Sequence, residues 1–393
     1  MEKKIMLKLK IPADILLILL LFLCPFLLAQ ETSLQERISV TGSGCSNPRI
    51  LVNSADESFV VWQGIKDARS RIFFRERKGK TWGSEILLDR SEWGDNTDPS
   101  IALDDQGNPH VIWRHSDPEI SSIEYAFRLK NEWIYSQTLR ESRDKNCEFP
   151  SIAIESGTNR VFVVWQEGRG SQYAIYGATQ DSSGRFVPVR VSRQGLQGYN
   201  VYPEIFIAPT PFVTWYGVND SNFVLSASLF NTQTEEWMRY DPAGFEHLPA
   251  NRLPFLMTDS EGLLYAVWYD SDGSTDRIYF AGQEDPSAGA GRIVDDNPEQ
   301  MNNTPACIVG KDKKVYLCWR GESIFGGQIF LKIGMARANV FDFRECRLIS
   351  DGQKLFYTQP DCHPYKEGSV GVVWISSALD GGDGAVYYRN ILP

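Results

Sequence analysis

Seven tryptophans recur along the chain, and the residue after six of them can form hydrogen bonds. The residues in this position are Gln63, Arg114, Gln166, Tyr216, Tyr269, Arg320 and Ile375. Amide, phenol and guanidinium groups together suit a sugar or a peptide, because planar donors pair with hydroxyl groups and aromatic rings stack on the apolar face of a sugar. Five of them, from successive repeats, form the predicted ligand site: Arg114, Gln166, Tyr216, Tyr269 and Arg320.

The charge of these residues and of the whole chain narrows the ligand class. The two arginines suggest an anionic ligand group such as the carboxylate of a uronic acid, which a guanidinium binds with two parallel hydrogen bonds. The chain carries 40 basic and 50 acidic residues, a net charge of −10. A negative surface repels phosphate backbones and anionic lipids. The expected partner is therefore a glycan or an extracellular protein, with no nucleic acid partner and no cofactor.

Side chains able to catalyse a reaction lie in the loops that follow the same tryptophans. The pairs that share a loop are His115 with Asp117, Glu167 with Arg169, Asp270 with Asp272, and Arg320 with Glu322. Two carboxylates facing each other across a site could cleave a glycosidic bond as general acid and base. A histidine near a tyrosine such as Tyr216 could instead abstract a proton, as polysaccharide lyases do. Because loops commonly contain such residues, no catalytic residue is assigned.

Metal sites and disulfides receive weaker support from the sequence. The segment 270–276 is rich in oxygen ligands but departs from the order of a calcium loop, so an acidic turn is favoured and no metal is expected. Six cysteines follow residue 29: Cys45, Cys147, Cys307, Cys318, Cys346 and Cys362. Cys307 and Cys318 flank a predicted hairpin and could face each other, and Cys346 and Cys362 flank one connection. The connectivity does not follow from the sequence, and free buried thiols are a fair alternative.

The elements that must position these residues follow a repeat. A proline precedes each recurrent tryptophan by 12 to 15 residues, and successive prolines are 51 to 55 residues apart; they are Pro48, Pro99, Pro150, Pro203, Pro254, Pro305 and Pro360. Each unit contains two apolar strands that end at the tryptophan, a third strand after a polar loop, and a more variable fourth. Four antiparallel strands per repeat, without helical periodicity, predict an all-β fold, a seven-bladed β-propeller.

The two ends of the chain support a closed ring and export. Residues 1–29 combine a basic start, an apolar run and a small residue at Ala29, which is typical of a secretory signal peptide. We expect cleavage there, a single propeller domain over residues 30–393, and a secreted or periplasmic location; lipidation of Cys24 is a weaker alternative. The last repeat stops after its third strand. The segment Arg37–Gly42 is therefore predicted to supply the missing strand and close the ring.

The recurrent tryptophans themselves are predicted to pack between blades rather than to bind ligand. His110, inside an apolar strand, is likewise expected to be a packed side chain. Neither feature therefore adds a residue to the predicted ligand site.

The repeats resemble a known family. Units such as PSIALDDQGNPHVIW, from Pro99 to Trp113, are similar to the BNR or sialidase-like repeats of bacterial secreted propellers. The Asp-box of that family is degenerate: residues 179–186 are one residue too long, and residues 77–82 lack the aspartate. The Phe/Tyr-Arg-Ile-Pro element of active sialidases has no counterpart, since Pro48-Arg49-Ile50 has the wrong order, and active sialidases have six blades. The resemblance implies a shared scaffold more than a shared reaction.

From these observations we expect a secreted, non-catalytic propeller that binds a glycan or protein ligand at the mouth of its axis. A glycoside hydrolase or polysaccharide lyase on the same scaffold is the alternative.

Overall fold

The structure is a computed structural model that describes residues 34–392, except 42, 136–137, 182, 193–197, 208, 220–221, 241–252, 272, 284–290, 297–300, 311, 324–325, 338–339, 344–345, 351–354 and 379–383. The predicted signal peptide, Cys24 and Asp272 lie outside the described residues. Among the described residues no helix is long and apolar enough to cross a membrane.

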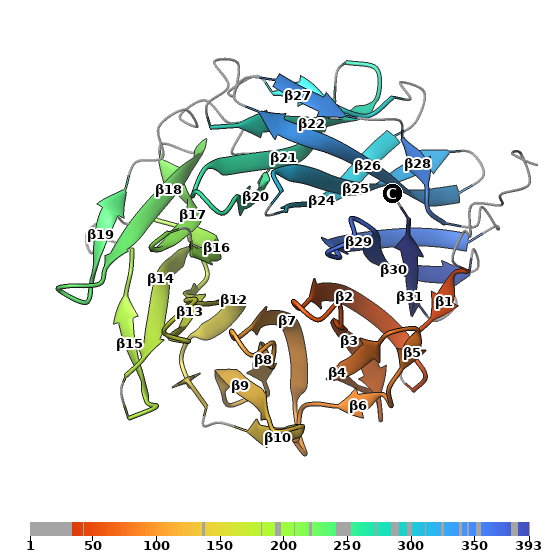
Figure 1. The fold of residues 1–393 in the computed structure, drawn as a ribbon. Coiled ribbons are helices and arrows are strands. Elements are labelled where there is room, and N and C mark those ends of the chain that lie inside the picture. Colours follow the sequence, from red (N-terminus) through yellow and green to blue (C-terminus); the bar gives the residue numbers. More distant parts are fainter. Residues whose placement is uncertain are drawn as a thin grey trace, which may run out of the picture.

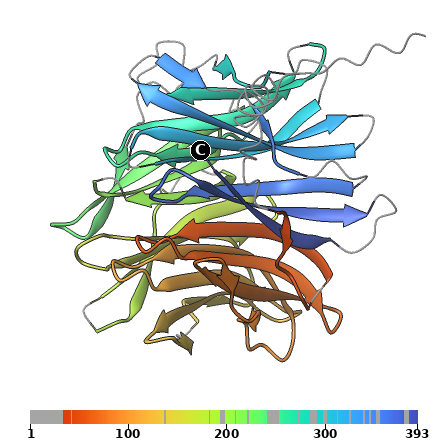
Figure 2. The same ribbon diagram turned by 45° about the vertical axis from the view of Figure 1, so that its right-hand side comes forward.

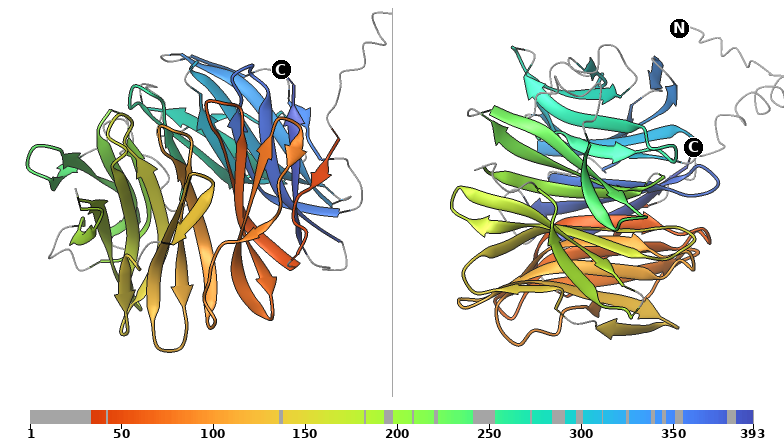
Figure 3. Two further views of the ribbon diagram at one scale, coloured as in Figure 1. Left: turned by 60° about the horizontal axis from the view of Figure 1, so that its bottom comes forward. Right: turned by 90° about the vertical axis from the view of Figure 1, so that its left-hand side faces the viewer.

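Seven antiparallel sheets are arranged around a central axis, which confirms the predicted seven-bladed propeller (Figure 1). Turned views show the sheets as successive layers of the ring (Figures 2 and 3). In six blades the strands follow the chain from the axis outward, and in blade 7 the outermost strand is the N-terminal β1. Where the outer position holds two short strands, both pair with the third strand of the blade.

The first four blades have the following strands. Blade 1 contains β2 (Ser43–Val52), β3 (Ser58–Lys66), β4 (Arg69–Lys78), β5 (Thr81–Trp82) and β6 (Ile86–Leu87). Blade 2 contains β7 (Asp95–Leu103), β8 (Pro109–Ser116), β9 (Ser121–Leu129), β10 (Glu132–Tyr135) and β11 (Arg140–Ser142). Blade 3 contains β12 (Asn146–Ile154), β13 (Val161–Arg169), β14 (Gln172–Gln180) and β15 (Phe186–Arg190). Blade 4 contains β16 (Asn200–Ile207), β17 (Pro211–Asn219), β18 (Asn222–Asn231) and β19 (Glu236–Tyr240).

The remaining three blades complete the ring. Blade 5 contains β20 (Phe255–Thr258), β21 (Leu264–Ser271), β22 (Asp276–Gly282) and β23 (Arg292–Ile293). Blade 6 contains β24 (Met301–Val309), β25 (Lys314–Ser323), β26 (Gly326–Arg337), β27 (Val340–Phe343) and β28 (Arg347–Leu348). Blade 7 contains β29 (Leu355–Pro364), β30 (Val370–Ala378), β31 (Ala385–Ile391) and β1 (Glu36–Arg37).

The ring is closed by the N-terminal strand, as predicted. β1 pairs antiparallel with β31, with Glu36 opposite Tyr388, so the two ends of the described chain meet in blade 7 (Figure 1). The strand is shorter than the predicted segment 37–42. The amides of Val40 and Thr41 donate to the carboxylate of Glu85, at 2.6 and 2.8 Å, and are thereby directed to blade 1 instead of β31.

The recurrent tryptophans are buried, with at most 6% of each side chain exposed. They lie in clusters that join adjacent blades; Trp165 of blade 3, for example, packs with Ile123 and Tyr125 of blade 2. The indole N–H groups of Trp113, Trp215 and Trp319 donate to the side-chain oxygens of Asn96, Asn200 and Asn302, at 3.1, 2.9 and 3.0 Å. The predicted packing role is confirmed.

A second repeated device fixes the outer strands. In five blades of the described chain, an apolar residue followed by Ser or Asp forms hydrogen bonds with both backbone groups of a single residue of the third strand. In blade 3 the Val191 amide donates to the Ile175 carbonyl at 2.8 Å, and the Ser192 hydroxyl accepts the Ile175 amide at 3.0 Å. The other pairs are Ile38-Ser39, Leu88-Asp89, Val294-Asp295 and Ile349-Ser350.

All six cysteines after residue 29 are free thiols in the structure. The expectation that Cys307 and Cys318 could face each other is wrong. Cys307 is paired with Leu317, one ladder position away from Cys318, so the two side chains point to opposite faces of blade 6. Cys307 packs in a cluster with blade 5, and Cys318 in a cluster with blade 7.

Candidate functional site

The residue before each blade proline has an unusual backbone conformation. These seven residues, the pre-proline ring, are Asn47, Asp98, Phe149, Tyr202, Leu253, Thr304 and Gln359, with φ between 45° and 55°. The left-handed region is unfavourable for residues with a Cβ atom, and a following proline also disfavours helical dihedrals. The inner strands carry a register shift at this point, for example between Thr97 and Ser100. Such strain is concentrated at functional sites.

The pre-proline ring surrounds the mouth of an axial cavity. One chamber of about 470 Å³ is lined by Asn47, Tyr202, Leu253, Thr304 and Gln359, together with Tyr216 and Tyr269. A second chamber of about 520 Å³ adjoins it, and the two share the lining residues Arg49, Tyr202 and Glu204. Asp98 and Phe149 line the second chamber. All seven members of the ring therefore contribute to one site.

The ring has a polar half and an aromatic half. The backbone N–H of Asn47 donates to Gln359 Oε1 at 2.8 Å. Its side-chain oxygen accepts from Gln359 Nε2 at 3.3 Å, and its Nδ2 donates to Asp98 Oδ1 at 3.5 Å. On the other side the rings of Phe149 and Tyr202 meet edge to face, with centroids 4.8 Å apart. Each of these two rings remains 37% exposed.

The mouth of the cavity therefore offers fixed hydrogen-bonding groups on one side and accessible aromatic faces on the other. Tyr269, at 38% exposed, extends the aromatic side, and Leu253, at 36% exposed, lies beside it in the same chamber. This combination suits a ligand with hydroxyl groups along its edge and an apolar face, which is the general chemistry of a sugar ring.

Charged residues lie one position after the proline in three blades. Arg49 lines both chambers and forms no hydrogen bond or ion pair with any described residue. Burial raises the pKa of the Asp98, Glu204 and Asp361 carboxyls, and the nearby positive charge of Arg49 partly opposes this in each case. These four residues make the interior of the axial cavity strongly polar.

The acidic residues of the cavity differ in their hydrogen-bond partners. Asp361 accepts the backbone N–H groups of Ile50 and Cys362, both at 3.0 Å, and thereby ties blade 7 to blade 1. Glu204 has no hydrogen-bond partner among the described residues and lines both chambers. Glu204 is therefore available to a ligand, whereas Asp361 is occupied by the backbone.

The five residues predicted from the sequence are only partly brought together. Tyr216 and Tyr269 line the mouth, although the Tyr216 hydroxyl is buried and donates to the Pro254 carbonyl at 2.6 Å. Arg114 and Arg320 are held by acidic neighbours: Arg114 Nη1 lies 3.4 Å from Glu148 Oε1, and Arg320 Nη2 lies 3.1 Å from Glu322 Oε1. Neither arginine is among the residues that line the two chambers.

Gln166 does not reach the cavity but holds a member of the pre-proline ring, Tyr202, by a hydrogen bond. It is 2% exposed, its Nε2 donates to Glu148 Oε2 at 3.0 Å, and its Oε1 accepts the Tyr202 amide at 2.9 Å. Gln166 belongs to the second strand of blade 3 and is not among the residues that line the two chambers. The sequence signal that we missed is the residue before each repeated proline.

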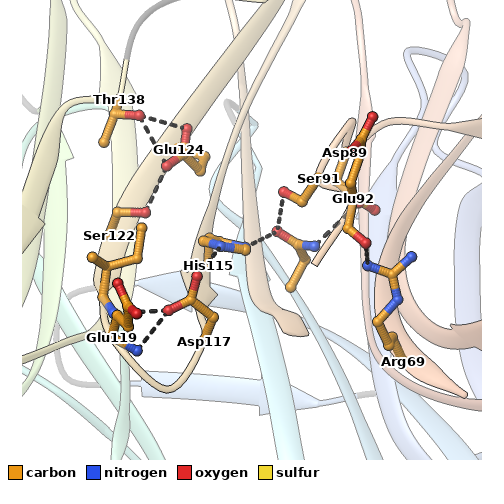
Figure 4. A network of polar contacts seen from close by, with 12 residues as sticks. Arg69, Asp89, Ser91, Glu92, His115, Asp117, Glu119, Ser122, Glu124 and Thr138 are labelled. Carbon is orange, nitrogen blue, oxygen red and sulfur yellow. Dashed lines mark hydrogen bonds and ion pairs between the residues drawn. The ribbon is translucent and has the colours of Figure 1, made fainter. Parts of the chain in front are cut away.

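The described members of the predicted catalytic pairs are not among the residues that line the axial cavity, and Asp272 lies outside the described residues. His115 Nδ1 lies 3.2 Å from Asn96 Oδ1, and Asp117 accepts the amides of Glu119 and Ile120. Figure 4 shows His115, Asp117 and Glu119 in this polar network. Glu167 is bound by Arg140 through both carboxylate oxygens at 2.8 Å. The carboxylates that do reach the axis are Asp98, Glu204 and Asp361. Among the described residues no group of three or more His, Cys, Asp or Glu side chains is placed to hold a metal ion.

Comparison with known proteins shows which solved structures share this fold. No family model matches the sequence, and no curated protein is significantly similar to it. An ulvan lyase of polysaccharide lyase family PL25 has a TM-score of 0.58 at 9% identity, covering 89% of this chain and 95% of its own. The chain has the propeller fold of these lyases. The predicted likeness to sialidase-like propellers is confirmed at the level of the scaffold.

Two further structures share this fold. A protein of unknown function from Dyadobacter fermentans has a TM-score of 0.54 at 10% identity, covering 92% of this chain and 99% of its own. The polysaccharide lyase Uly1 has a TM-score of 0.52 at 9% identity, covering 93% of both chains. At such low identities the likeness extends to the fold alone.

Proposed function

We propose that this protein is an exported propeller that binds a saccharide at the mouth of its axial cavity. The observation that carries the proposal is the pre-proline ring, in which seven strained residues present an amide and carboxylate half opposite an aromatic half. The two chambers, of about 470 and 520 Å³, have the size of small-ligand sites. Export rests on the signal peptide predicted over residues 1–29.

The roles of the residues follow from their positions. Tyr202 and Phe149 stack on the apolar face of a sugar ring, while Gln359, Asn47 and Asp98 bind its hydroxyl groups. Gln166 holds the Tyr202 backbone and thereby fixes the aromatic half. Because these groups are held in place before the ligand arrives, little conformational entropy is lost on binding.

The structural neighbours support a saccharide as the ligand class. The ulvan lyase with the same fold is described as bound to -[GlcA(1-4)Rha3S]-. We also propose that the ligand of this chain carries an anionic group, but that a different arginine from the two predicted binds it. Since Arg114 and Arg320 are already paired, Arg49 is the arginine in the cavity that can receive a carboxylate.

The proposal is tested by screening the mature protein on a glycan and polysaccharide array, followed by calorimetry on each ligand found. Tyr202→Ala removes the central aromatic face, and we expect it to weaken binding by about 10-fold or more, as losing a well-placed contact costs about 1–3 kcal/mol. Trp93→Ala is the matched control, because Trp93 is an aromatic residue that is 77% exposed and does not line either chamber.

Binding of no saccharide by the folded wild type would contradict the proposal. So would equal affinities of Tyr202→Ala and the wild type, since the axial mouth would then not be the site. Arg49→Gln separates the ligand's charge from its binding: it should weaken binding of carboxylate-bearing ligands more than binding of neutral ones.

A second candidate, enzymatic cleavage of the saccharide, is favoured by one observation. Glu204 is a carboxyl group in the cavity without a hydrogen-bond partner among the described residues, and its pKa is raised by burial. A carboxyl with a raised pKa keeps its proton to higher pH than an ordinary glutamate and can act as a general acid. New reducing ends or unsaturated products that form with the wild type and not with Glu204→Gln would establish this activity, whereas an intact ligand after long incubation would leave binding alone.

A further inference from the structure

Two cysteines from adjacent blades meet in the core between them. Cys318 lies on β25 of blade 6 and Cys362 on β29 of blade 7, and their side chains are 0% and 2% exposed. Burial raises the pKa of the Cys318 thiol, and the neighbouring Cys362 thiol raises it further. Cys362 Sγ also donates across the blade boundary to the Tyr316 carbonyl at 3.5 Å, two residues from Cys318 on the same strand. Both thiols belong to the packed cluster between blades 6 and 7, so they lie near each other where the two blades join.

Cys307 is close to this pair but is oriented differently. Its side chain packs in the cluster shared by blades 5 and 6, whereas Cys318 and Cys362 belong to the cluster shared by blades 6 and 7. Cys307 and Cys362 both line the chamber of about 520 Å³, but neither packed cluster contains both of them. The packing therefore selects Cys318 as the partner of Cys362.

We propose that Cys318 and Cys362 form a disulfide that links blade 6 to blade 7 in the exported protein. This inference rests on the export that is part of the proposed function, because disulfides persist in oxidising compartments outside the cytoplasm. The oxidant is a disulfide, either a small molecule such as oxidised glutathione or a dithiol oxidoreductase. One cysteine thiolate attacks it to form a mixed disulfide, and the second displaces the remaining thiol. The two cysteines are oxidised, and the oxidant leaves as two thiols carrying the protons.

The proposed disulfide would strengthen the attachment of blade 7 within the propeller ring. Blade 7 is completed on its outer side by β1, a strand of two residues. A covalent bond to blade 6 would attach blade 7 to its neighbour in the ring and would close a loop that contains β26, β27 and β28. Since both thiols are buried in the folded protein, the exchange takes place while blades 6 and 7 are still assembling.

Peptide mapping tests the bond without any substitution. The chain from residue 30 to residue 393 is refolded with reduced and oxidised glutathione, alkylated, and digested with trypsin without reduction. We expect the peptide Val315–Arg320 to be linked to Leu355–Lys366. Unlinked peptides, or a link from Leu355–Lys366 to Ile293–Lys311, which contains Cys307, would overturn the proposal.

Counting thiols in the unfolded, non-reduced protein gives an independent result. We expect four of the six cysteines to be alkylated in the wild type and five of five in Cys318→Ala or Cys362→Ala. Cys147→Ala is the control, because this buried cysteine lies in blade 3, and three of its five remaining thiols should be alkylated. Six reactive thiols in the oxidised wild type would contradict the disulfide. Saccharide binding is measured separately, so failure of one proposal is distinguishable from failure of the other.

Discussion

The fold changes the pKa values of single buried side chains, as His110 shows. His110 lies in blade 2 at 8% exposed, where its Nδ1 is 2.6 Å from the Tyr125 hydroxyl and its ring stacks on Phe127. Burial lowers the pKa of His110 to about 4, although the nearby Asp104 carboxylate acts in the opposite direction. The prediction from the sequence, a packed histidine, is confirmed. His110 is therefore neutral in the folded protein at neutral pH.

This neutrality predicts a loss of stability in mild acid. The unfolded chain takes up a proton on His110 below about pH 6.5, while the folded chain does so only near pH 4, so the free energy of unfolding falls as the pH drops between these values. Between pH 7 and pH 5 the loss from this residue is about 2 kcal/mol. Urea unfolding at both pH values measures it, and His110→Gln should reduce the difference by that amount. An unchanged pH dependence in this variant would contradict the assignment.

At the scale of the strand, short local motifs attach the outer edge of each blade. The Ser192 hydroxyl and the Val191 amide together satisfy both backbone groups of Ile175, and Ser39 and Ser350 occupy the same position in other blades. Asp89 and Asp295 replace the hydroxyl by a carboxylate that also binds Arg71 or Arg277. The outer strands are thus held by side chains as well as by the sheet ladder.

Removing one of these oxygens should cost stability in proportion to what it leaves unpaired. Ser192→Ala leaves a buried amide without an acceptor, and we expect a loss of about 1–3 kcal/mol in the free energy of unfolding. Asp89→Ala also leaves the buried Arg71 guanidinium without its carboxylate, and should cost about 3–5 kcal/mol. Chemical denaturation measures both. Thr158→Ala, in an exposed turn, is the control and should change the free energy by about 0.5 kcal/mol or less.

At the scale of the whole molecule, stability depends on closing the ring. β1 covers the edge of β31, and the residues after it contribute to the core, since Ile38 is 0% exposed and Ser39 binds the Val386 amide at 3.0 Å. The N-terminal segment therefore covers a sheet edge and fills part of the last blade. An uncovered edge strand is a template for association with another chain.

Deleting residues 30–42 should therefore lower the melting temperature and promote aggregation. Deleting residues 30–35 is the matched control, because it leaves β1 and Ile38 in place. Size-exclusion chromatography and thermal denaturation measure both outcomes. A monomeric protein with an unchanged melting temperature after the longer deletion would show that the strand is not needed for closure.

The sequence alone predicts the blade number, the strand order, the packing of the tryptophans and the closure by an N-terminal strand. These features depend on patterns that recur within each repeat of about fifty residues: an early proline, alternating apolar residues and a tryptophan at the end of the second strand. Because each blade is formed from consecutive strands, neighbours in sequence are also neighbours in the sheet.

Only the tertiary structure decides which side chains reach the axis and which meet across blades. The left-handed conformation before each proline places Tyr202 and Gln359 at the mouth of the cavity, whereas Arg114, one strand further out, pairs with Glu148 of the next blade. Cys318 and Cys362 are likewise brought together only by the packing of two blades. Side-chain direction at a strand bulge and contacts between repeats depend on the assembled ring, and the spacing of residues within one repeat does not determine them.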